Sequence, residues 1–505
     1  MSQKFAQGLR RFALAVVVAA TVALGLVPIA SAGSPSLPDP GQVGSLTIHK
    51  TRAGDALSGV PGAPIAGVTF SVQQVTGIDL ATTQGWQDAS TLSASFDADD
   101  ASGSIQAAGH GLAAAAGSPV ATDAAGEASL SGLPLGLYLV SETSWPAGTT
   151  PSAPFVVAVP QTRTEGTGWQ YDIDVYPKNS VDGVTKTVED AGALALGDLV
   201  SWTITGDIPN VASIDGYKIV DHLDAKLDYR SATVSLVDGT SVSPGTDFTV
   251  AFDSATHTVA VTFTAAGRTL LAAHRATQVV VVVETAVNAV GEVANMAVLY
   301  PNQHSFDIAP GEPGGPVTTP PVLTKWGSIT VQKTDTSGTP LAGAVFSVYP
   351  SKADAQAGTR AVTLDGRSSF PVDAAGRLTI SGLRYSAFAN GAAVAPGDDG
   401  YRTYWLGETA APQGYERLGE PIEFTVTSKT SSVGVDLVVA DVRTAVEPPH
   451  GCKNADECAP PGVVQIIHGV LPSTGGPRLV ILLGGTLLLI GGVVLVRTSR
   501  RRDEI

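Results

Sequence analysis

Short runs of alternating apolar and polar residues cover most of the chain between its two ends. Examples are SLTIHK near residue 45, YDIDVYPKN near residue 171 and SITVQK near residue 328. Side chains on a strand point alternately to its two faces, so a period of two residues predicts strands with one face in a core. Gly, Pro, Asp and Ser separate these runs, and little of this region has a helical period. The pattern is typical of β-sandwiches and predicts an all-β protein.

Two stretches of the chain repeat each other around a different middle stretch. GSLTIHKT from Gly44 returns as GSITVQKTD from Gly327, and DAAGEASLSGL from Asp123 returns as DAAGRLTISGL from Asp373. We therefore expect three tandem immunoglobulin-like sandwich domains, whose boundaries are residues 33–179, 180–310 and 326–446. A Pro- and Gly-rich linker at 311–325 and a stalk at 447–470 complete this division.

The first domain contains an insertion rich in Ala, Ser and Asp, residues 77–119. We expect loop with a short helix there. Its DADDASGS run suggests a calcium loop, but the distal Glu of such a loop is absent. We predict no metal site and no cofactor.

The N-terminal end has the three parts of a secretory signal. An apolar run ends near Val27, and the small residues Ala30, Ser31 and Ala32 offer a cleavage site. The basic residues before the run are Lys4, Arg10 and Arg11. A membrane anchor is the alternative, which the short run and the small residues after it disfavour. We predict a signal peptide at residues 1–32 and export of the chain.

The C-terminal end combines a short motif, an apolar run and a basic tail. LPSTGG precedes the apolar residues 479–496, which would form a helix of roughly 27 Å against a hydrocarbon core of about 30 Å. Arginines follow at 497, 500, 501 and 502, as expected for a positive cytoplasmic flank. A plain membrane anchor would explain the run and the tail, but not the LPSTG before them.

This order of elements resembles the cell-wall sorting signal of Gram-positive surface proteins, whose pattern is LPXTG followed by a span and a basic tail. The motif residues here are Leu471, Pro472, Ser473, Thr474 and Gly475. The resemblance implies that a sortase cleaves between Thr474 and Gly475 and holds Thr474 as a thioester. An amine that attacks the thioester becomes joined to Thr474. Residues 476–505 would then be the transmembrane sorting segment with its basic tail.

Removal of both ends makes the chain more acidic. The whole sequence has 30 basic and 46 acidic residues. The signal contains three basic residues, and the segment after Thr474 contains five basic and two acidic residues, which leaves 22 basic against 44 acidic. This balance argues against nucleic acid or an anionic membrane as a partner.

The two cysteines lie in the Pro-rich stalk. Cys452 and Cys458 are too few for a disulfide framework, although an exported chain permits one. We favour a single local disulfide. A zinc site with His450 or His468, or two free thiols, are the alternatives.

In the third domain, strand parity places charged residues on apolar faces. Lys333 shares the apolar face of SITVQK, Glu408 that of YWLGE and Asp441 that of VDLVVADV. Buried charges without partners are costly, so such groups tend to become neutral. A neutral amine is a nucleophile, and a protonated carboxylic acid is an electrophile and a proton source.

This combination resembles the CnaB-type domains of Gram-positive adhesins and pilins. In those domains a first-strand Lys condenses with a last-strand Asn or Asp, assisted by the Glu of an E-box, which YWLGETAAPQGY matches here. The resemblance implies an isopeptide bond between Lys333 and Asp441, with Glu408 as the catalytic residue. Because the acceptor is Asp, condensation would release water. A buried, uncondensed ion pair is the alternative.

The middle domain has inward polar residues with a different spacing. Lys186 shares a face with the apolar residues of VTKTV, Asp221 with those of KIVDHL and Asn295 with those of EVANMAV. This set resembles the CnaA-type pilin domain. The resemblance implies that Lys186 joins Asn295 and that Asp221 polarises the amide.

The first domain offers a third candidate set. Lys50, Glu142 and Asn179 each share a face with apolar neighbours. However, SETSWPAGTT departs from the E-box after its ETxxP core, and many pilins of this kind lack a bond in this domain. Lys50–Asn179 therefore remains a weaker candidate.

Lys178, the outward-facing residue beside Asn179, is the last residue of another motif. WQYDIDVYPK resembles the pilin motif WxxxVxVYPK of sortase-assembled pili, with Ile173 in place of one Val. The resemblance implies that the Lys178 amine resolves the sortase thioester, so that Lys178 of one subunit is joined to Thr474 of the next. A solubilising surface charge or edge guard is the alternative.

Together these motifs predict the structural backbone subunit of a covalent pilus, secreted and anchored in the cell wall. Its partners would be copies of itself, pilus-polymerising and housekeeping sortases, accessory tip and base pilins, and peptidoglycan. A singly anchored adhesin or a minor tip or base pilin is the alternative. The sequence has no GxSxG or HExxH motif and no paired-carboxylate cleft, so we do not expect an enzyme.

Overall fold

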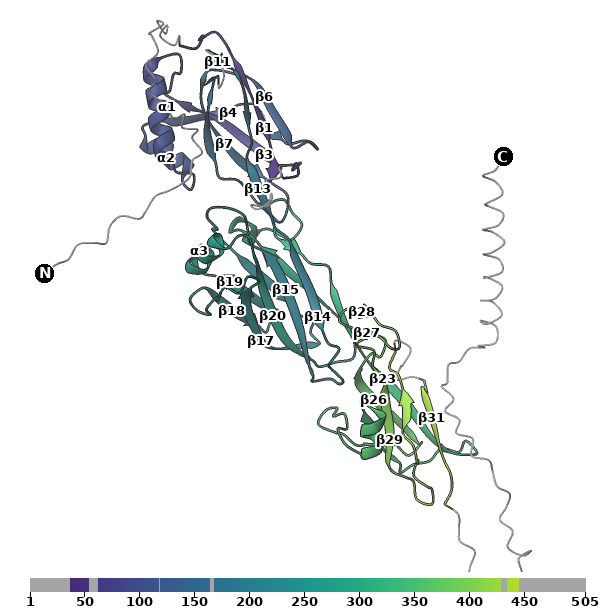
Figure 1. Cartoon of the computed structure of the whole chain (residues 1–505). Coiled ribbons are helices and arrows are strands. Elements are labelled where there is room, and N and C mark those ends of the chain that lie inside the picture. The colour runs from purple at the N-terminus through teal and green to yellow at the C-terminus, as the bar shows by residue number, and fades with distance from the viewer. Residues whose placement is uncertain (1–36, 54–61, 118, 164–167, 428–433, 445–505) are drawn as a thin grey trace, which may run out of the picture.

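The computed structural model describes residues 37–53, 62–117, 119–163, 168–427 and 434–444. These residues form three β-rich domains arranged end to end in an elongated molecule (Figure 1). The expected signal peptide, the cysteines, the LPSTG motif and the C-terminal apolar run lie outside the described residues. Among the described residues, no helix is long and apolar enough to cross a membrane.

The first domain is a sandwich of a three-stranded and a five-stranded sheet, with a further two-stranded and a further three-stranded pairing. The main orders are β12-β1-β6 and β4-β3-β7-β9, with β5 beside β3, and β2-β13-β8 closes the end that meets the middle domain. The elements are β1 (Gly44–His49), β2 (Thr51–Arg52), β3 (Thr69–Thr76), α1 (Thr83–Ser95), α2 (Ala101–Ala107), β4 (Gly111–Ala115), β5 (Val120–Ala121), β6 (Glu127–Leu133), β7 (Gly136–Ser144), β8 (Thr149–Thr150), β9 (Phe155–Val159), β10 (Gln161–Thr162), β11 (Trp169–Gln170), β12 (Asp172–Val175) and β13 (Lys178–Val181).

The insertion in this domain is more ordered than the sequence suggested, because it contains two helices and strand β4. Thr82 caps α1 by accepting from the Gly85 N–H at 3.0 Å, and Leu92 and Ile105 pack on the outer face of β3 and β7. The expected loop was therefore wrong over much of this segment. Asp100 of the DADDASGS run caps α2, which explains an Asp at that position.

The middle domain is a second sandwich, whose core includes Trp202 and Phe263. Sheet β14-β15-β20-β17 faces sheet β18-β19-β16-β21. The elements are β14 (Val184–Glu189), β15 (Leu199–Asp207), β16 (Lys218–His222), β17 (Leu227–Leu236), β18 (Phe248–Asp253), β19 (Thr258–Phe263), α3 (Ala265–Ala273), β20 (Gln278–Val287), β21 (Gly291–Tyr300), the 3-10 helix η1 (His304–Asp307) and β22 (Val317–Thr318).

The third domain shares a long strand with the middle one. Strand β23 pairs first with β21 and then with β26 and β31. It begins within the stretch expected as a linker, and Trp326 is buried in the middle core. The elements are β23 (Val322–Asp335), β24 (Val345–Tyr349), α4 (Lys352–Ala357), β25 (Phe370–Pro371), β26 (Arg377–Arg384), β27 (Phe388–Ala389), β28 (Ala392–Ala393), β29 (Tyr404–Ala410), β30 (Ile422–Phe424) and β31 (Leu437–Asp441).

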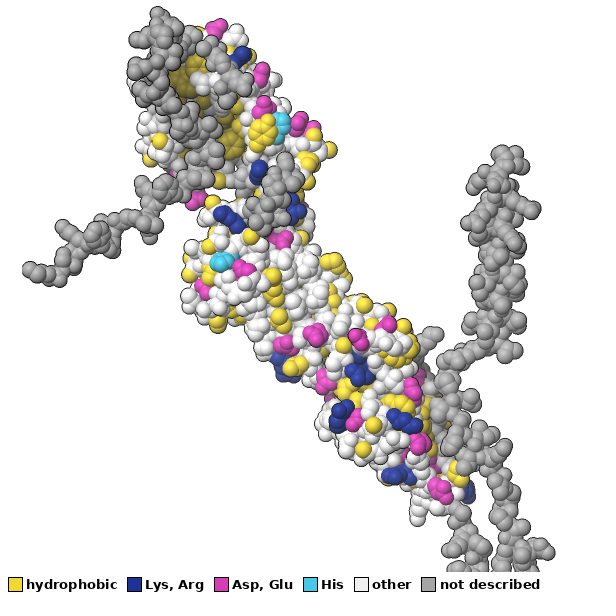
Figure 2. Space-filling model, viewed as in Figure 1, with side chains coloured by type: hydrophobic (Ala, Val, Ile, Leu, Met, Phe, Trp, Pro, Cys, Tyr) yellow, Lys and Arg dark blue, Asp and Glu magenta, His cyan; other side chains and the backbone are white. Residues whose placement is uncertain are grey.

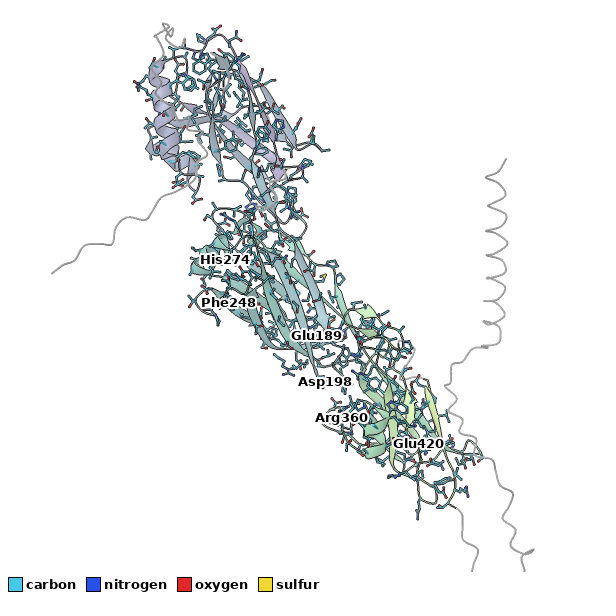
Figure 3. The ribbon with its side chains drawn as sticks, in the orientation of Figure 1. Glu189, Asp198, Phe248, His274, Arg360 and Glu420 are labelled. Carbon is cyan, nitrogen blue, oxygen red and sulfur yellow. The ribbon has the colours of Figure 1, made fainter. Side chains whose placement is uncertain are left out.

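A loop of the middle domain adds to the junction with the third domain. Figure 3 labels Glu189 and Asp198, between which this loop runs from β14 to β15. Within it, Ala195 belongs to the third domain's core, and the Leu194 carbonyl accepts from the Arg384 N–H at 3.1 Å. The Arg384 side chain is fully buried and donates to the Ala193 carbonyl at 3.2 Å. Strand sharing and this inserted loop therefore couple the two domains.

Candidate isopeptide and polymerisation sites

The structure brings together the three residues predicted for the third domain. Lys333 comes from β23, Glu408 from β29 and Asp441 from the end of β31, and their side chains have no exposed surface. The Lys333 Nζ atom contacts Asp441 Oδ1 and lies 3.1 Å from Glu408 Oε1. It also lies 5.6 Å from the ring centre of Phe346. The amine thus reaches both carboxyl groups in a dry, apolar setting.

The chemistry of this set follows from its burial. Burial raises the pKa of Glu408, although the Leu418 N–H, which donates to Glu408 Oε2 at 2.8 Å, acts in the opposite direction. Asp441 Oδ2 has no hydrogen-bond partner among the described residues. A protonated Glu408 beside the Lys333 amine and the Asp441 carboxyl is the arrangement that general acid catalysis of condensation needs.

The middle set is equally buried. Lys186 Nζ lies 2.5 Å from Asp221 Oδ1, and Asn295 Nδ2 donates to Asp221 Oδ2 at 3.3 Å. Burial lowers the pKa of Lys186 to about 8 and raises the pKa of Asp221. Desolvation therefore favours a neutral amine and a protonated acid in contact with the Asn295 amide.

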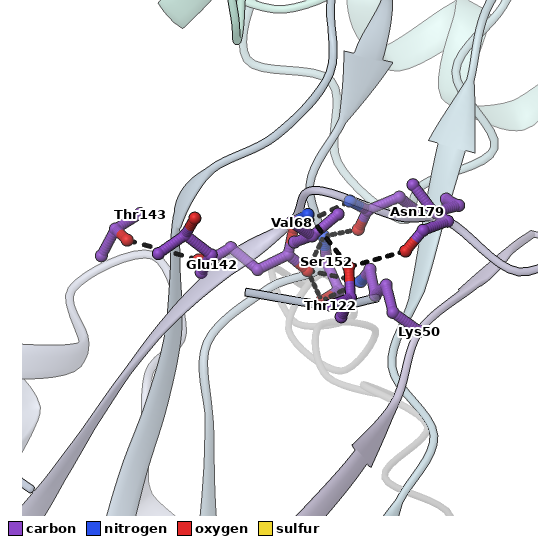
Figure 4. A network of polar contacts seen from close by, with 9 residues as sticks. Lys50, Val68, Thr122, Glu142, Thr143, Ser152 and Asn179 are labelled. Atoms are coloured by element: carbon purple, nitrogen blue, oxygen red, sulfur yellow. Dashed lines mark hydrogen bonds and ion pairs between the residues drawn. The ribbon is translucent and has the colours of Figure 1, made fainter. Parts of the chain in front are cut away.

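The first domain holds the most densely connected set (Figure 4). Lys50 Nζ contacts Glu142 Oε1, and Asn179 Nδ2 donates to Glu142 Oε2 at 2.8 Å. Lys50 and Asn179 are fully buried, and burial lowers the pKa of Lys50. One carboxyl group thus bridges the amine and the amide.

Sequence reasoning missed Ser152, which lies within this first-domain set. Its backbone N–H donates to Asn179 Oδ1 at 2.6 Å, and its hydroxyl donates to Glu142 Oε1 at 2.5 Å. The signal that could have found it is the spacing between repeats, because Ser152 and Leu418 both lie ten residues after the Glu that they contact.

Lys178 lies outside these buried sets, at the start of β13. Its side chain is exposed while that of Asn179 is buried, as the alternation predicted. The sequence predicts a single strand here, but β12 ends at Val175 and β13 begins at Lys178. Pro177 lies in the interruption and has no N–H to donate to a ladder. The alternation nevertheless holds across the break.

Stacked aromatic rings hold two further residues of the WQYDIDVYPK motif, Trp169 and Tyr176, in place. Tyr176 is 64% exposed and stacks on His49 with ring centres 4.7 Å apart. Trp169 stacks on Trp86 of α1 at 4.9 Å, so the helical insertion packs against the motif's first residue. Lys178 therefore projects from a strand end braced by ring stacking and by the buried Asn179.

Family models match three successive stretches of the chain. Residues 44–180 match the N-terminal domain of Gram-positive pilin subunit D1, residues 184–299 match the Sgo0707 N2 domain, and residues 327–438 match the prealbumin-like fold domain. The fimbrial subunit type 2 of Actinomyces naeslundii is 32% identical over 98% of this chain and 97% of its own length. The chain belongs to the Gram-positive pilin family.

Further relatives agree with this family. The fimbrial subunit type 1 of Actinomyces viscosus is 30% identical to this pilin over 97% of the chain and 98% of its own length. The full-length major pilin SpaD of Corynebacterium diphtheriae superposes with a TM-score of 0.60 at 27% identity and covers 81% of this chain and all of SpaD. The major pilin SpaA of the same species gives 0.53 at 26% identity, over 77% of this chain and 96% of SpaA. This pilin is a backbone subunit of a surface pilus.

Proposed function

We propose that a sortase joins this pilin head to tail through Thr474 of one subunit and Lys178 of the next. The observation that carries this proposal is the exposed Lys178 at the end of the first domain, beside a buried Asn179. An acyl-enzyme can reach an amine at such a position without unfolding the domain. Thr474 and Gly475, between which cleavage would occur, and the rest of the sorting motif lie outside the described residues.

The polymer would be anchored in peptidoglycan and stiffened by internal isopeptide bonds. We infer bonds between Lys186 and Asn295, between Lys333 and Asp441, and between Lys50 and Asn179, because each pair shares a buried acid in contact with its Lys. By analogy with a disulfide that closes a loop of about 100 residues, each bond would stabilise its domain by about 4–5 kcal/mol. The pilin itself would then promote only the formation of its own internal bonds, each of which forms once. The sortase would catalyse the joining of subunits.

The bonds would also set the path of mechanical load. Tension from Lys178 enters the main chain eight residues before Lys186 and passes through the Lys186–Asn295 bond into β21. Strand β21 pairs with β23, which carries Lys333 to its bond with Asp441. The first domain lies almost entirely on the N-terminal side of Lys178, outside this path. Its bond would therefore serve to hold the acceptor strand rather than to carry load.

Replacement of Lys178 tests the intermolecular link. Lys178→Ala in the producing cell is expected to abolish the ladder of high-mass species that denaturing gels of wall extracts show for a covalent polymer. Lys178→Arg, which keeps the charge but lacks a primary amine, is expected to behave like Lys178→Ala. A ladder that persists in both variants would contradict Lys178 as the acceptor and would mean that another amine resolves the thioester, whereas a wild-type chain without a ladder would favour a singly anchored protein.

A further inference from the structure

Ser152 contacts every member of the first domain's buried set (Figure 4). Its hydroxyl accepts from Lys50 Nζ at 3.1 Å and donates to Glu142 Oε1 at 2.5 Å. Its backbone N–H donates to Asn179 Oδ1 at 2.6 Å and lies 3.2 Å from Glu142 Oε1. The hydroxyl therefore forms a second hydrogen-bonded path from the amine to the carboxyl group, beside the direct contact of Lys50 Nζ with Glu142 Oε1.

We propose that the Ser152 hydroxyl is a second catalytic group, beside Glu142, in the condensation of Lys50 with Asn179, where it relays to Glu142 the proton that remains on Nζ after the amine has attacked Asn179. This inference rests on the bond proposed above for the first domain. The backbone N–H of the same residue holds the Asn179 carbonyl oxygen. Because an N–H can only donate, this contact turns the amide nitrogen toward Glu142, where it must leave.

The reaction balances without a further reactant. Lys50 first passes one proton directly to Glu142 Oε1, which it contacts, and the neutral amine then attacks Cγ of Asn179. The C=O electron pair moves to Oδ1, which the Ser152 N–H stabilises. The Glu142 carboxyl group turns so that the proton received at Oε1 faces Nδ2 and passes to it, the Cγ–Nδ2 bond breaks, and ammonia leaves. A second proton from Nζ passes through Ser152 to Glu142, and one amide has replaced another.

The other two domains help to distinguish the role of the Ser152 hydroxyl from the role of the Ser152 backbone N–H. In the third domain the N–H ten residues after the catalytic Glu belongs to Leu418, and it donates to Glu408 Oε2 at 2.8 Å. An N–H at this position is thus common to both repeats, whereas only the first has a hydroxyl there. In the middle domain, Asn295 Oδ1 has no hydrogen-bond partner among the described residues. The first domain therefore differs from the other two in having an N–H that donates to the acceptor carbonyl and a hydroxyl that contacts both the amine and the acid.

The role of Ser152 can be measured in the full-length chain. Proteolytic peptides are sampled at intervals after synthesis, and mass spectrometry quantifies the branched peptide that joins Lys50 to Asn179. The Lys186–Asn295 peptide of the same molecules serves as the internal reference. Ser152→Ala, and Ser152→Leu, which copies the third domain, are expected to slow the first bond by a factor on the order of 100 or more and to leave the reference unchanged. Ser152→Thr keeps the hydroxyl and is expected to retain most of the rate.

Each outcome separates the relay from the bond itself. If Ser152→Ala and Ser152→Leu form the Lys50–Asn179 peptide at the wild-type rate, the relay is wrong and the proposed bond stands. If the wild-type chain forms the reference peptide but no Lys50–Asn179 peptide, the bond of the first domain is wrong and the relay falls with it. Ser141→Ala, on the same strand as Glu142, controls for loss of a serine nearby. A Ser152→Thr chain that folds but is as slow as Ser152→Ala also contradicts the relay.

Discussion

Lys178 and Asn179 are adjacent in β13, yet Lys178 is exposed and Asn179 is fully buried against Glu142 and Ser152. The proposed acceptor for polymerisation and the proposed acceptor for the internal bond of the first domain are thus consecutive residues. Acidic and basic side chains are scattered over all three domains on the face that Figure 2 shows, so the visible charge alone does not single out Lys178. What distinguishes Lys178 is its position beside a residue that fixes the strand.

This adjacency predicts that the two acceptors can be separated by mutation. Asn179→Ala is expected to remove the Lys50–Asn179 bond and to make the first domain more sensitive to protease, because Glu142 and Ser152 lose their amide partner. The polymer ladder is expected to remain, although in reduced amount, since the Lys178 amine is unchanged. Gel analysis of wall extracts and timed proteolysis measure the two effects. Complete loss of the ladder would mean that the braced strand is indispensable for the sortase.

Asn295→Ala is expected to leave the middle domain without its bond. The intact mass should then lack the loss of one ammonia that the Lys186–Asn295 bond causes. The free energy of unfolding of this domain should fall by about 4–5 kcal/mol, which corresponds to a lower melting temperature by roughly 20 °C or more. Asn288→Ala, at an exposed position in the same domain, is the control for the mass measurement. A wild-type mass with no ammonia lost from this segment would contradict the bond.

Glu408→Gln is expected to prevent condensation in the third domain, because an amide at this position cannot give or take the proton. The intact mass should rise by one water relative to the condensed chain, after correction for the substitution itself. Lys333 and Asp441 would remain as a buried ion pair, which stabilises less than a covalent bond. Glu416→Gln, an exposed position in the following segment, should leave condensation complete. Water loss at full yield in Glu408→Gln would exclude Glu408 as the catalytic acid.

Asp182 at the junction of the first and middle domains predicts a pH dependence. Its side chain is buried and accepts from Ser180 Oγ at 2.5 Å and Thr150 Oγ1 at 3.2 Å. Burial raises the pKa of Asp182 to about 7, and the neighbouring charges are those of Asp207 and Arg52. Because the folded state holds this proton more tightly than the unfolded chain, the contribution of Asp182 to stability is largest below its ordinary pKa of 3.8 and is lost as the pH rises through about 7.

Thermal unfolding of Asp182→Asn and of the wild type between pH 4 and pH 8 measures this effect. The variant keeps an acceptor oxygen but does not ionise, so its stability relative to the wild type is expected to increase from pH 4 to about pH 7 and to level off above it. Other titrating groups are shared by the two chains and cancel in the difference. A difference that does not change with pH would show that Asp182 has the same affinity for its proton in both states.

Much of the fold and most of the candidate site residues could be predicted from local pattern. Strand alternation assigned Lys333, Glu408 and Asp441 to core faces, and all three are buried, because a period of two residues determines the face wherever a strand is regular. The internal repeat likewise indicated that the first and third domains are of one kind. The sequence predicted one short helix in the insertion, whereas the structure has two, because Ala and Ser carry little apolar signal and the buried apolar residues of the helices are only Ala89, Leu92 and Ile105.

By itself, the sequence determined the class of fold, the faces of the strands and the identity of the acids and amines directed into the cores. Only the tertiary structure decided which groups meet. Ser152 reaches Lys50 because β8 and the chain after it close the end of the first domain, and Ala195 enters the third core because the β14–β15 loop pairs beside β26. Contacts between residues 100 or more positions apart depend on how sheets close and domains dock, and no local period records that geometry.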